Sequence, residues 1–322
     1  MARPTRRNRP IFHWYRQTPF GPELVICLFT RGCRYRSCSF CALPSVTAGE
    51  VDESYREINA QVDHVFAQFS GAQLQAVWKL SIFNNGSVLD QATMPTKSLL
   101  YLFLKAADLP SLKVVSLESR EEYVEDWELK VLRQILGGRA ELEITLGFET
   151  HDERIRNRVL NKGLTVKRFE KLLEMLAANG VRLKCYVMLK PDVMLTEEQG
   201  IEEAVRTIEY LGQVAGTYRV AMAVHLNPTY VARGTRLERQ FKENGYLPPD
   251  LDSIFRVVLS TQRVGLWTYV GLDDEGLAAT DSAFRCERLP RQAATAALER
   301  FNATNDYEEL RAFYQNEKAK TT

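Results

Sequence analysis

Three closely spaced cysteines are the residues of this chain best suited to chemistry. Cys33, Cys38 and Cys41 form the pattern C-x4-C-x2-C directly after the apolar run Leu24–Phe29. We expect that run to be a buried strand, so the thiols should lie on the loop at its carboxyl end, where parallel α/β folds place their active sites. Three thiolates with no fourth ligand nearby indicate an iron–sulfur cluster with one iron left open to another ligand.

A structural zinc site is the main alternative for these thiols. Zinc in such sites normally takes four protein ligands, often as two pairs, and the sequence offers no second pair, so a remote His or Cys would have to complete the site. Cys27 and Cys185 lie within apolar strands and are predicted to be core residues. Cys286 is expected to be an idle thiol, with hydrogen-atom donation to a product radical as the alternative. Three scattered cysteines are too few for an auxiliary cluster.

Composition sets broad limits on the class of protein. The chain has 322 residues, 45% of them hydrophobic, and a formal net charge of +1. That is enough for one large core. No apolar run reaches the roughly 18 residues that span a bilayer, and the basic amino terminus lacks the apolar stretch of a secretory signal. Together with the cysteine usage, this predicts a soluble protein of the reducing cytoplasm.

The amino terminus is predicted to be a basic arm. The first 36 residues contain a single acidic residue, Glu23. The arginines of the same stretch are Arg3, Arg6, Arg7, Arg9, Arg16, Arg31, Arg34 and Arg36. Such an arm can contact the phosphates of a nucleic acid. A solvated tail is the more common outcome for a run of charges.

Strand-like and helix-like stretches alternate along the chain. Short apolar runs predict strands buried on both faces at Leu24–Phe29, Val77–Phe83, Lys113–Leu117, Leu142–Gly147, Leu183–Leu189 and Val220–Leu226. Helical patterns between them cover Tyr55–Phe69, Lys97–Ala107, Trp127–Leu136, Val166–Ala178 and Glu197–Leu211. Six such units predict an α/β fold with a parallel sheet curved into a partial (β/α)6 barrel.

The pattern loosens after the sixth strand. Tyr246–Pro249 is a break, and Asp250 can cap a helix that runs to about Arg263. A strand at Trp267–Leu272 and helices at Ala293–Phe301 and Tyr307–Tyr314 should follow. We therefore expect a basic arm over residues 1–20, a partial barrel over 21–232, and a mixed, mainly helical extension over 233–322 that packs on the barrel.

The cysteine pattern and the order of elements resemble the radical S-adenosylmethionine (radical SAM) superfamily over residues 20–230. In that family three cysteines after the first barrel strand hold a [4Fe–4S] cluster, whose open iron binds S-adenosylmethionine. Reductive cleavage of this cofactor gives a 5′-deoxyadenosyl radical that abstracts a hydrogen from the substrate. The usual spacing is C-x3-C-x2-C with an aromatic residue before the last cysteine. Phe40 matches that aromatic, whereas the first gap here holds four residues, a variant that the superfamily contains.

The resemblance also implies contacts to S-adenosylmethionine at successive strand ends. The loop after the second strand should meet the amino group, Glu118 and Arg120 the ribose and carboxylate, and the segment around Met188 the adenine. The residues implied are Phe40, Asn84, Asn85, Gly86, Ser87, Glu118, Arg120, Glu149, Arg156 and Met188. Taken singly, each has an ordinary explanation as a turn or a solvated ion pair.

Other phrases narrow the branch of the superfamily. Residues 83–87, 117–124 and 147–156 resemble the subgroup of the elongator catalytic subunit and the methylthiotransferases. Short motifs resemble the radical SAM subunits of archaeosine synthase at 161–163, 190–191, 227–231, 234–235 and 246–249. Those subunits act on a lysine-modified deazaguanine in tRNA and cleave a C–N bond, which makes them lyases. The segment 283–288 lacks the His- and Cys-rich pattern expected there, and no RNA-binding module follows.

Two substrate classes therefore stay open, a modified tRNA base and a small metabolite or natural-product precursor. The resemblance also implies an electron donor such as flavodoxin or ferredoxin, and allows a partner subunit. Weak catalytic candidates are Lys190, His225, Asn227 and Cys286, while Tyr230 and Tyr269 can wall a cavity. A hypothesis from another class is a metal-stabilised RNA-binding protein without catalysis.

Overall fold

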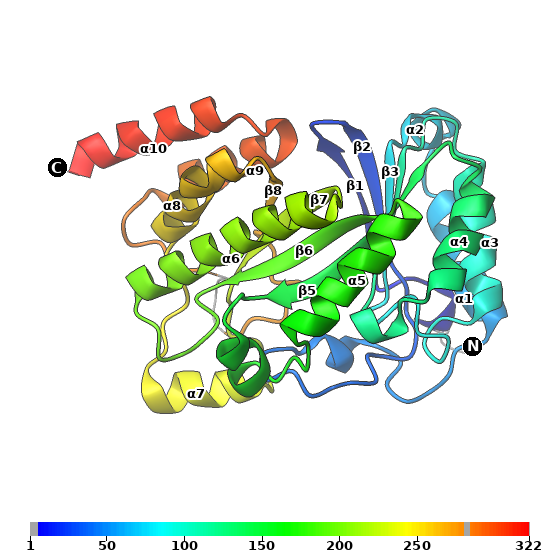
Figure 1. Ribbon diagram of the computed structural model, residues 1–322, viewed down its shortest axis with the longest axis horizontal. Coiled ribbons are helices and arrows are strands. Elements are labelled where there is room, and N and C mark those ends of the chain that lie inside the picture. Colours follow the sequence, from blue (N-terminus) through cyan, green and yellow to red (C-terminus); the bar gives the residue numbers. More distant parts are fainter. Residues whose placement is uncertain (1–5, 280–283, 322) are drawn as a thin grey trace, which may run out of the picture. The chain divides into compact units, whose positions relative to one another are not determined.

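The computed structural model describes residues 6–279 and 284–321, so the predictions for Arg3 and Ala283 fall outside the described residues. The chain divides into two compact units. The first unit is residues 1–36, 43–146 and 171–183, and the second unit is residues 37–42, 147–170 and 184–322. Figure 1 shows strands and helices alternating along the chain, coloured from blue to red. Strands alternating with helices confirm the predicted α/β class.

Parallel pairing dominates the first unit. Its strands are β1 (Phe12–Thr18), β2 (Gly21–Cys27), β3 (Lys79–Phe83), β4 (Val114–Glu118) and the first part of β5 (Glu141–Glu149). β2 to β5 pair in parallel, whereas β1 runs antiparallel to β2. Sequence analysis missed β1, because its seven residues lie inside the stretch that was interpreted as a basic arm.

The first unit contains several short helices, of which α1 (Tyr55–Phe66) and α2 (Gly71–Ala76) begin with capping boxes. The helices of this unit are η1 (Arg6–Asn8), η2 (Leu43–Val46), α1, α2, α3 (Thr96–Ala107), η3 (Glu121–Tyr123) and α4 (Asp126–Leu136), while α5 (Val166–Asn179) has residues in both units. Ser54 and Glu57 form a capping box at α1. The predicted helices at α1, α3, α4 and α5 are confirmed.

The second unit holds the remaining strands and the carboxyl-terminal helices. Its elements are η4 (Ile155–Val159), β6 (Arg182–Leu189), α6 (Glu197–Tyr218), β7 (Met222–Pro228), α7 (Arg236–Asn244), α8 (Leu251–Thr261), η5 (Gln262–Val264), β8 (Trp267–Val270), α9 (Arg291–Thr304) and α10 (Tyr307–Thr321). β7 and β8 pair in parallel. Asp250 caps α8 as predicted. None of the helices in the described residues is long and apolar enough to cross a bilayer.

The strands of the first unit carry apolar side chains on one face and several buried polar side chains on the other. In the first unit Leu24 and Leu80 are fully buried on the apolar face. On the other face, Glu23 lies beside Lys79, and Ser116 lies beside Glu143. The prediction of burial on both faces holds here, but the second face also contains paired polar groups among its apolar side chains.

Candidate cofactor and substrate site

The loop that carries Cys33 packs closely on the loop after β3. The backbone N–H of Cys33 donates to the carbonyl of Asn85 at 3.3 Å. Gly86 permits this approach, because a Cβ at that position would stand 3.0 Å from the Cys33 nitrogen and 3.2 Å from its Cα. Gly86, one of the residues implied by the resemblance, therefore lets the loop after β3 pack directly on the first cysteine of the motif.

Two buried amide groups lie at this contact. Asn84 donates to the Thr93 hydroxyl at 3.2 Å, and the Asn85 side-chain oxygen lies 3.4 Å from the Cys27 sulfur. The Asn84 Oδ1 and Asn85 Nδ2 atoms are buried without a partner in the described residues. An unpaired buried polar atom costs about 1–3 kcal/mol. One acceptor and one donor beside Cys33 are thus ready for a ligand that has both kinds of group.

The end of β4 is tied to the same loop. The Ser87 hydroxyl accepts from the backbone N–H of Arg120 at 3.1 Å. The Arg120 guanidinium donates to Glu122 at 2.6 Å and lies over the Tyr35 ring, 3.8 Å from its centroid. Burial alone would raise the pKa of Glu122, but the bond and charge of Arg120, together with bonds from its own backbone and from Glu121, lower the pKa overall. Glu118, the last residue of β4, accepts the Val88 N–H through its carbonyl at 2.8 Å.

Cys38 and Cys41 lie in the second unit on a loop fixed by its neighbours. Ser39 donates from its backbone N–H to Leu160 at 3.0 Å and from its hydroxyl to Val159 at 2.8 Å. Phe40 packs against two apolar clusters, which are Ile155, Leu160 and Met188, and Val231, Leu237 and Tyr246. The aromatic residue before the last cysteine therefore anchors this loop, and the buried Met188 is one of its contacts.

Glu149 and Arg156 have different surroundings. Glu149 is paired with Lys162 at 2.8 Å, and a Cβ at Gly147 would overlap both charged groups, so the glycine leaves room for the pair. Arg156 is fully buried and donates to the carbonyls of Leu164 at 2.7 Å and Thr150 at 2.6 Å. Burial lowers the pKa of Arg156. These bonds make Arg156 a support for the segment after β5.

Left-handed backbone recurs where strands end. Asn85 after β3, Glu149 at the end of β5 and Lys190 after β6 have φ angles of 54°, 69° and 59°. Asparagine tolerates this region, whereas it strains Glu and Lys. Strained residues of this kind tend to gather at functional sites, because they aim a side chain that regular backbone would turn away.

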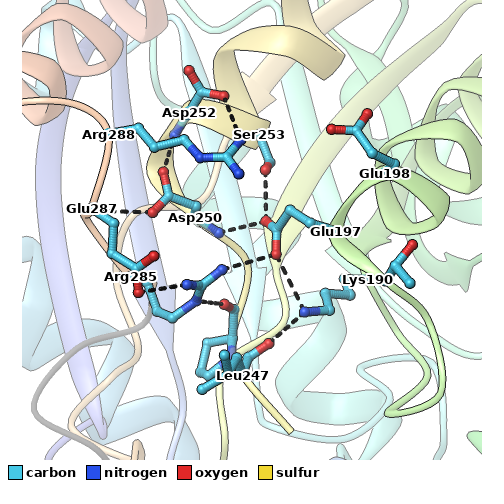
Figure 2. Close-up of polar contacts among 12 residues, drawn as sticks. Lys190, Glu197, Glu198, Leu247, Asp250, Asp252, Ser253, Arg285, Glu287 and Arg288 are labelled. Carbon is cyan, nitrogen blue, oxygen red and sulfur yellow. Dashed lines mark hydrogen bonds and ion pairs between the residues drawn. The ribbon is translucent and has the colours of Figure 1, made fainter. Parts of the chain in front are cut away.

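Lys190 belongs to a charge network centred on Glu197 (Figure 2). The Glu197 carboxylate accepts from Lys190 at 3.2 Å, Arg285 at 3.1 Å, the Ser253 hydroxyl at 2.6 Å and the Asp250 backbone at 2.7 Å. Burial alone would raise the pKa of Glu197, yet these bonds lower it overall. The Lys190 ammonium is therefore held by a carboxylate of its own unit.

The remaining candidates from the sequence are Cys286, near the start of the carboxyl-terminal helices, and the side chains around β7. Cys286 donates to the carbonyl of Leu289 at 2.8 Å, and burial raises its pKa. His225 and Asn227 share the polar face of β7, and a Cβ at Gly271 would stand 3.0 Å from the His225 Nε2 and overlap the Asn227 oxygen. The rings of Tyr186 and Tyr269 lie 5.0 Å and 4.6 Å from that of His225. Burial raises the pKa of Tyr230.

The predicted metal ligands are divided between the two units, with Cys33 in the first unit and Cys38 and Cys41 in the second unit. Within residues 6–279 and 284–321, no three His, Cys, Asp or Glu side chains are already gathered as a metal site. The donor chemistry nevertheless fits an iron–sulfur cluster, since soft thiolates are its ligands. The unpaired Asn84 and Asn85 atoms beside Cys33 fit a ligand with amino and carboxylate groups.

Several contact residues escaped sequence reasoning. Tyr35, whose ring lies under Arg120, is inside the cysteine motif. Its position between two arginines was the one feature of the sequence that could have indicated this contact. Lys162 lies in a short motif that sequence analysis used only for its resemblance. Gly147 and Gly271 gave no signal, because their importance depends on side chains that meet only in the fold.

The arrangement defines an α/β protein with a parallel sheet and a cysteine loop at the end of its first parallel strand. No family model matches the chain. It is 27% identical over 290 residues to archaeosine synthase subunit beta of Thermococcus kodakarensis, covering 89% of this chain and 86% of that one. The protein of the same name from Methanosarcina acetivorans is 27% identical over 269 residues, covering 80% and 73%. These relatives confirm the resemblance to that subunit.

Other similarities are more general. An uncharacterised protein of Methanocaldococcus jannaschii is 28% identical over 318 residues, covering 93% of this chain and 82% of that one. Among solved structures, Elp3 of Methanocaldococcus infernus has a TM-score of 0.48 at 13% identity, covering 83% of this chain and 59% of that one. SuiB of Streptococcus suis bound to its precursor peptide has a TM-score of 0.49 at 14% identity, covering 81% and 51%.

Proposed function

We propose that this chain is a radical SAM enzyme, with a [4Fe–4S] cluster held by Cys33, Cys38 and Cys41 and S-adenosylmethionine bound beside it. The observation that carries the proposal is the three-thiol loop followed by two buried, unpaired amide atoms next to its first cysteine. When bound, the cluster would supply the electron that cleaves S-adenosylmethionine to a hydrogen-abstracting radical. Similarity to archaeosine synthase subunit beta over most of the chain supports this proposal.

The residues of the first unit would bind and orient the cofactor. The Asn84 oxygen can accept from the amino group of S-adenosylmethionine, and the Asn85 amide can donate to its carboxylate. Arg120 already forms a bond with Glu122 and covers Tyr35, so its main task would be to hold the cysteine loop in place. Glu118, at the end of β4, would meet the ribose.

Residues of the second unit would exclude water and fix the other cysteines. Phe40, packed on Met188, would hold the loop of Cys38 and Cys41 and present an apolar surface to the cofactor. The Glu149–Lys162 pair would stay closed, with Gly147 leaving it room. Arg156 would act as a positioning residue through its backbone bonds.

For the reaction we propose C–N bond cleavage on a lysine-modified deazaguanine in tRNA, since the relatives carry the name of archaeosine synthase subunit beta. That name also favours a partner subunit, and a ferredoxin or flavodoxin would serve as the electron donor. Oxygen-sensitive chemistry on tRNA fits a cytoplasmic protein. Residues 21–232 would form the catalytic barrel, and the extension 233–322 would pack on it.

The test uses tRNA carrying a lysine-modified deazaguanine deuterated in its lysine moiety, with reconstituted full-length protein under anaerobic conditions. The proposal predicts deuterium in 5′-deoxyadenosine and release of the cleaved base product. A small metabolite as the true substrate would give 5′-deoxyadenosine without label from the tRNA. Absence of 5′-deoxyadenosine under every condition would reject the enzyme assignment itself.

A further inference from the structure

The polar face of β6–β8 in the second unit differs from an ordinary core surface. Tyr186, His225, Asn227 and Tyr269 are all partly exposed, although they lie on strands whose other face is fully buried. The register places His225 beside Tyr269. Alternation then puts Asn227 and Gly271 next to one another one step further along the strands. We call Tyr186, His225, Asn227, Tyr269 and Gly271 the aromatic-amide face.

Three rings of this face form a row. The Tyr186 and His225 centroids are 5.0 Å apart, and the Tyr269 ring meets the His225 ring at 4.6 Å with an interplanar angle of 76°. Aromatic surfaces of this kind, partly open to solvent, stack well on flat heteroaromatic ligands. The five residues of the aromatic-amide face include no carboxylate or ammonium, and the one lysine on the same side of β6, Lys184, is buried. The exposed part of the face therefore suits a neutral ring rather than an ion.

Asn227 supplies the means to distinguish one ring from another. Its amide makes no hydrogen bond within the part of the chain that the structure describes, and it is only partly exposed. A side-chain amide offers one acceptor and two donors, which matches a ring edge that presents a donor next to an acceptor. The three rings therefore offer a surface for stacking, and the Asn227 amide can form hydrogen bonds with the edge of the stacked ring.

Gly271 keeps this recognition group open. A Cβ at position 271 would overlap the Asn227 Oδ1 and stand 3.0 Å from the His225 Nε2. Any larger residue would cover the polar atoms of both side chains or push them aside. The φ of Gly271 does not demand glycine, since it is not among the positive-φ glycines. The glycine therefore leaves space in front of the Asn227 amide.

We propose that the aromatic-amide face is the substrate-recognition surface, that it binds a neutral flat heteroaromatic base through the ring row and the Asn227 amide, and that Gly271 is a specificity-determining residue. This inference rests on the proposed function, because it names the surface that would hold the base of the proposed substrate. It also limits the substrate to a molecule that contains such a base.

The experiment measures binding rather than turnover. The full-length protein without cofactor is titrated with 7-deazaguanosine and, separately, with L-tryptophan, a flat ring that lacks the donor–acceptor edge. The variants are Asn227→Ala and Gly271→Ala, and the matched controls are Gln213→Ala and Gly216→Ala on the exposed side of α6, where an added Cβ meets open space.

Asn227→Ala and Gly271→Ala should weaken 7-deazaguanosine binding by about tenfold or more, as expected for loss of a paired base edge. The controls should bind like the wild type, and any tryptophan binding should not depend on Asn227. Unchanged binding in both variants, or no saturable binding by the wild type, would overturn the inference. A second measurement tests the proposed function separately. Reconstituted protein without substrate should release 5′-deoxyadenosine from S-adenosylmethionine, and this release does not depend on base binding because neither variant changes a proposed cofactor residue.

Discussion

Both units have polar side chains on one side of their strands, but the polar groups of the two units have different surroundings. In the first unit Lys79 pairs with Glu143 at 2.6 Å, and Glu23 with Arg16 at 2.7 Å, with Lys79 and both carboxylates almost fully buried. In the second unit the aromatic-amide face has no carboxylate or ammonium among its five residues and is partly exposed, and its Asn227 amide makes no hydrogen bond within the described residues. Closed charge pairs hold strands together, whereas a partly exposed amide without a partner is available to a ligand.

The largest effect should follow from breaking a closed pair. Lys79→Met leaves the Glu143 carboxylate buried without its main cation, which costs about 3–5 kcal/mol of the free energy of unfolding. Urea unfolding followed by circular dichroism measures this change. The double variant Lys79→Met with Glu143→Leu should recover much of the loss, because two apolar groups need no partner. A Lys79→Met protein as stable as the wild type would remove the distinction between the two faces.

A somewhat smaller effect is expected at the charge network of Figure 2, the closed arrangement of the second unit. Glu197→Gln takes the negative charge from between Lys190 and Arg285, and should lower the free energy of unfolding by about 2–3 kcal/mol. Because the folded pKa of Glu197 is lowered, its contribution is present above the unfolded pKa and lost as acid protonates the folded carboxylate. The wild type should therefore lose more stability than the variant between pH 5 and about pH 3.

Glu128 on α4 shows how a buried carboxyl group without a cationic partner affects the pH dependence of stability. Burial and the nearby Glu125 raise its pKa to about 7, and its Oε1 has no partner in the described residues. A raised pKa means that stability is lost as the pH rises from about 4.5 to 7. Glu128→Gln should be more stable than the wild type by about 1 kcal/mol at pH 8, with little difference at pH 4.5. Thermal melts at the two pH values decide this, and equal melts at pH 8 would contradict it.

The smallest effect belongs to the open face. Asn227→Ala should change the free energy of unfolding by less than about 0.5 kcal/mol, since the amide gives up no hydrogen bond with the described chain. The same urea experiment as for Lys79→Met provides the measurement. A loss of 2 kcal/mol or more would show that Asn227 supports the fold, and the contrast between the two faces would disappear.

The sequence predicted the six strands from β2 to β7 because short apolar runs recur between helical patterns. It missed β1, since Phe12, Trp14 and Arg16 alternate with other aromatic and polar residues inside a basic stretch. It missed α7, whose residues are almost entirely polar. The polar faces also escaped prediction, because charges such as Glu23 and Lys79 lie singly within or beside apolar runs and find their partners only across strands.

The chemistry proposed for the candidate site comes from the sequence, whereas its contacts come from the fold. Thiol spacing alone indicates a cluster, and the structure shows Phe40 packed against two apolar clusters. The approach of Gly86 to Cys33 and the space that Gly271 leaves for Asn227 depend on pairs far apart in the chain, which no local pattern reports.

The most direct test of the central claim is anaerobic reconstitution of the full-length protein with iron and sulfide, followed by reduction with S-adenosylmethionine present. The account predicts about four irons per chain and release of 5′-deoxyadenosine, both lost in Cys38→Ala and both retained in the matched variant Cys286→Ala. A wild-type protein that binds zinc instead, or that holds iron equally well without Cys38, would contradict it.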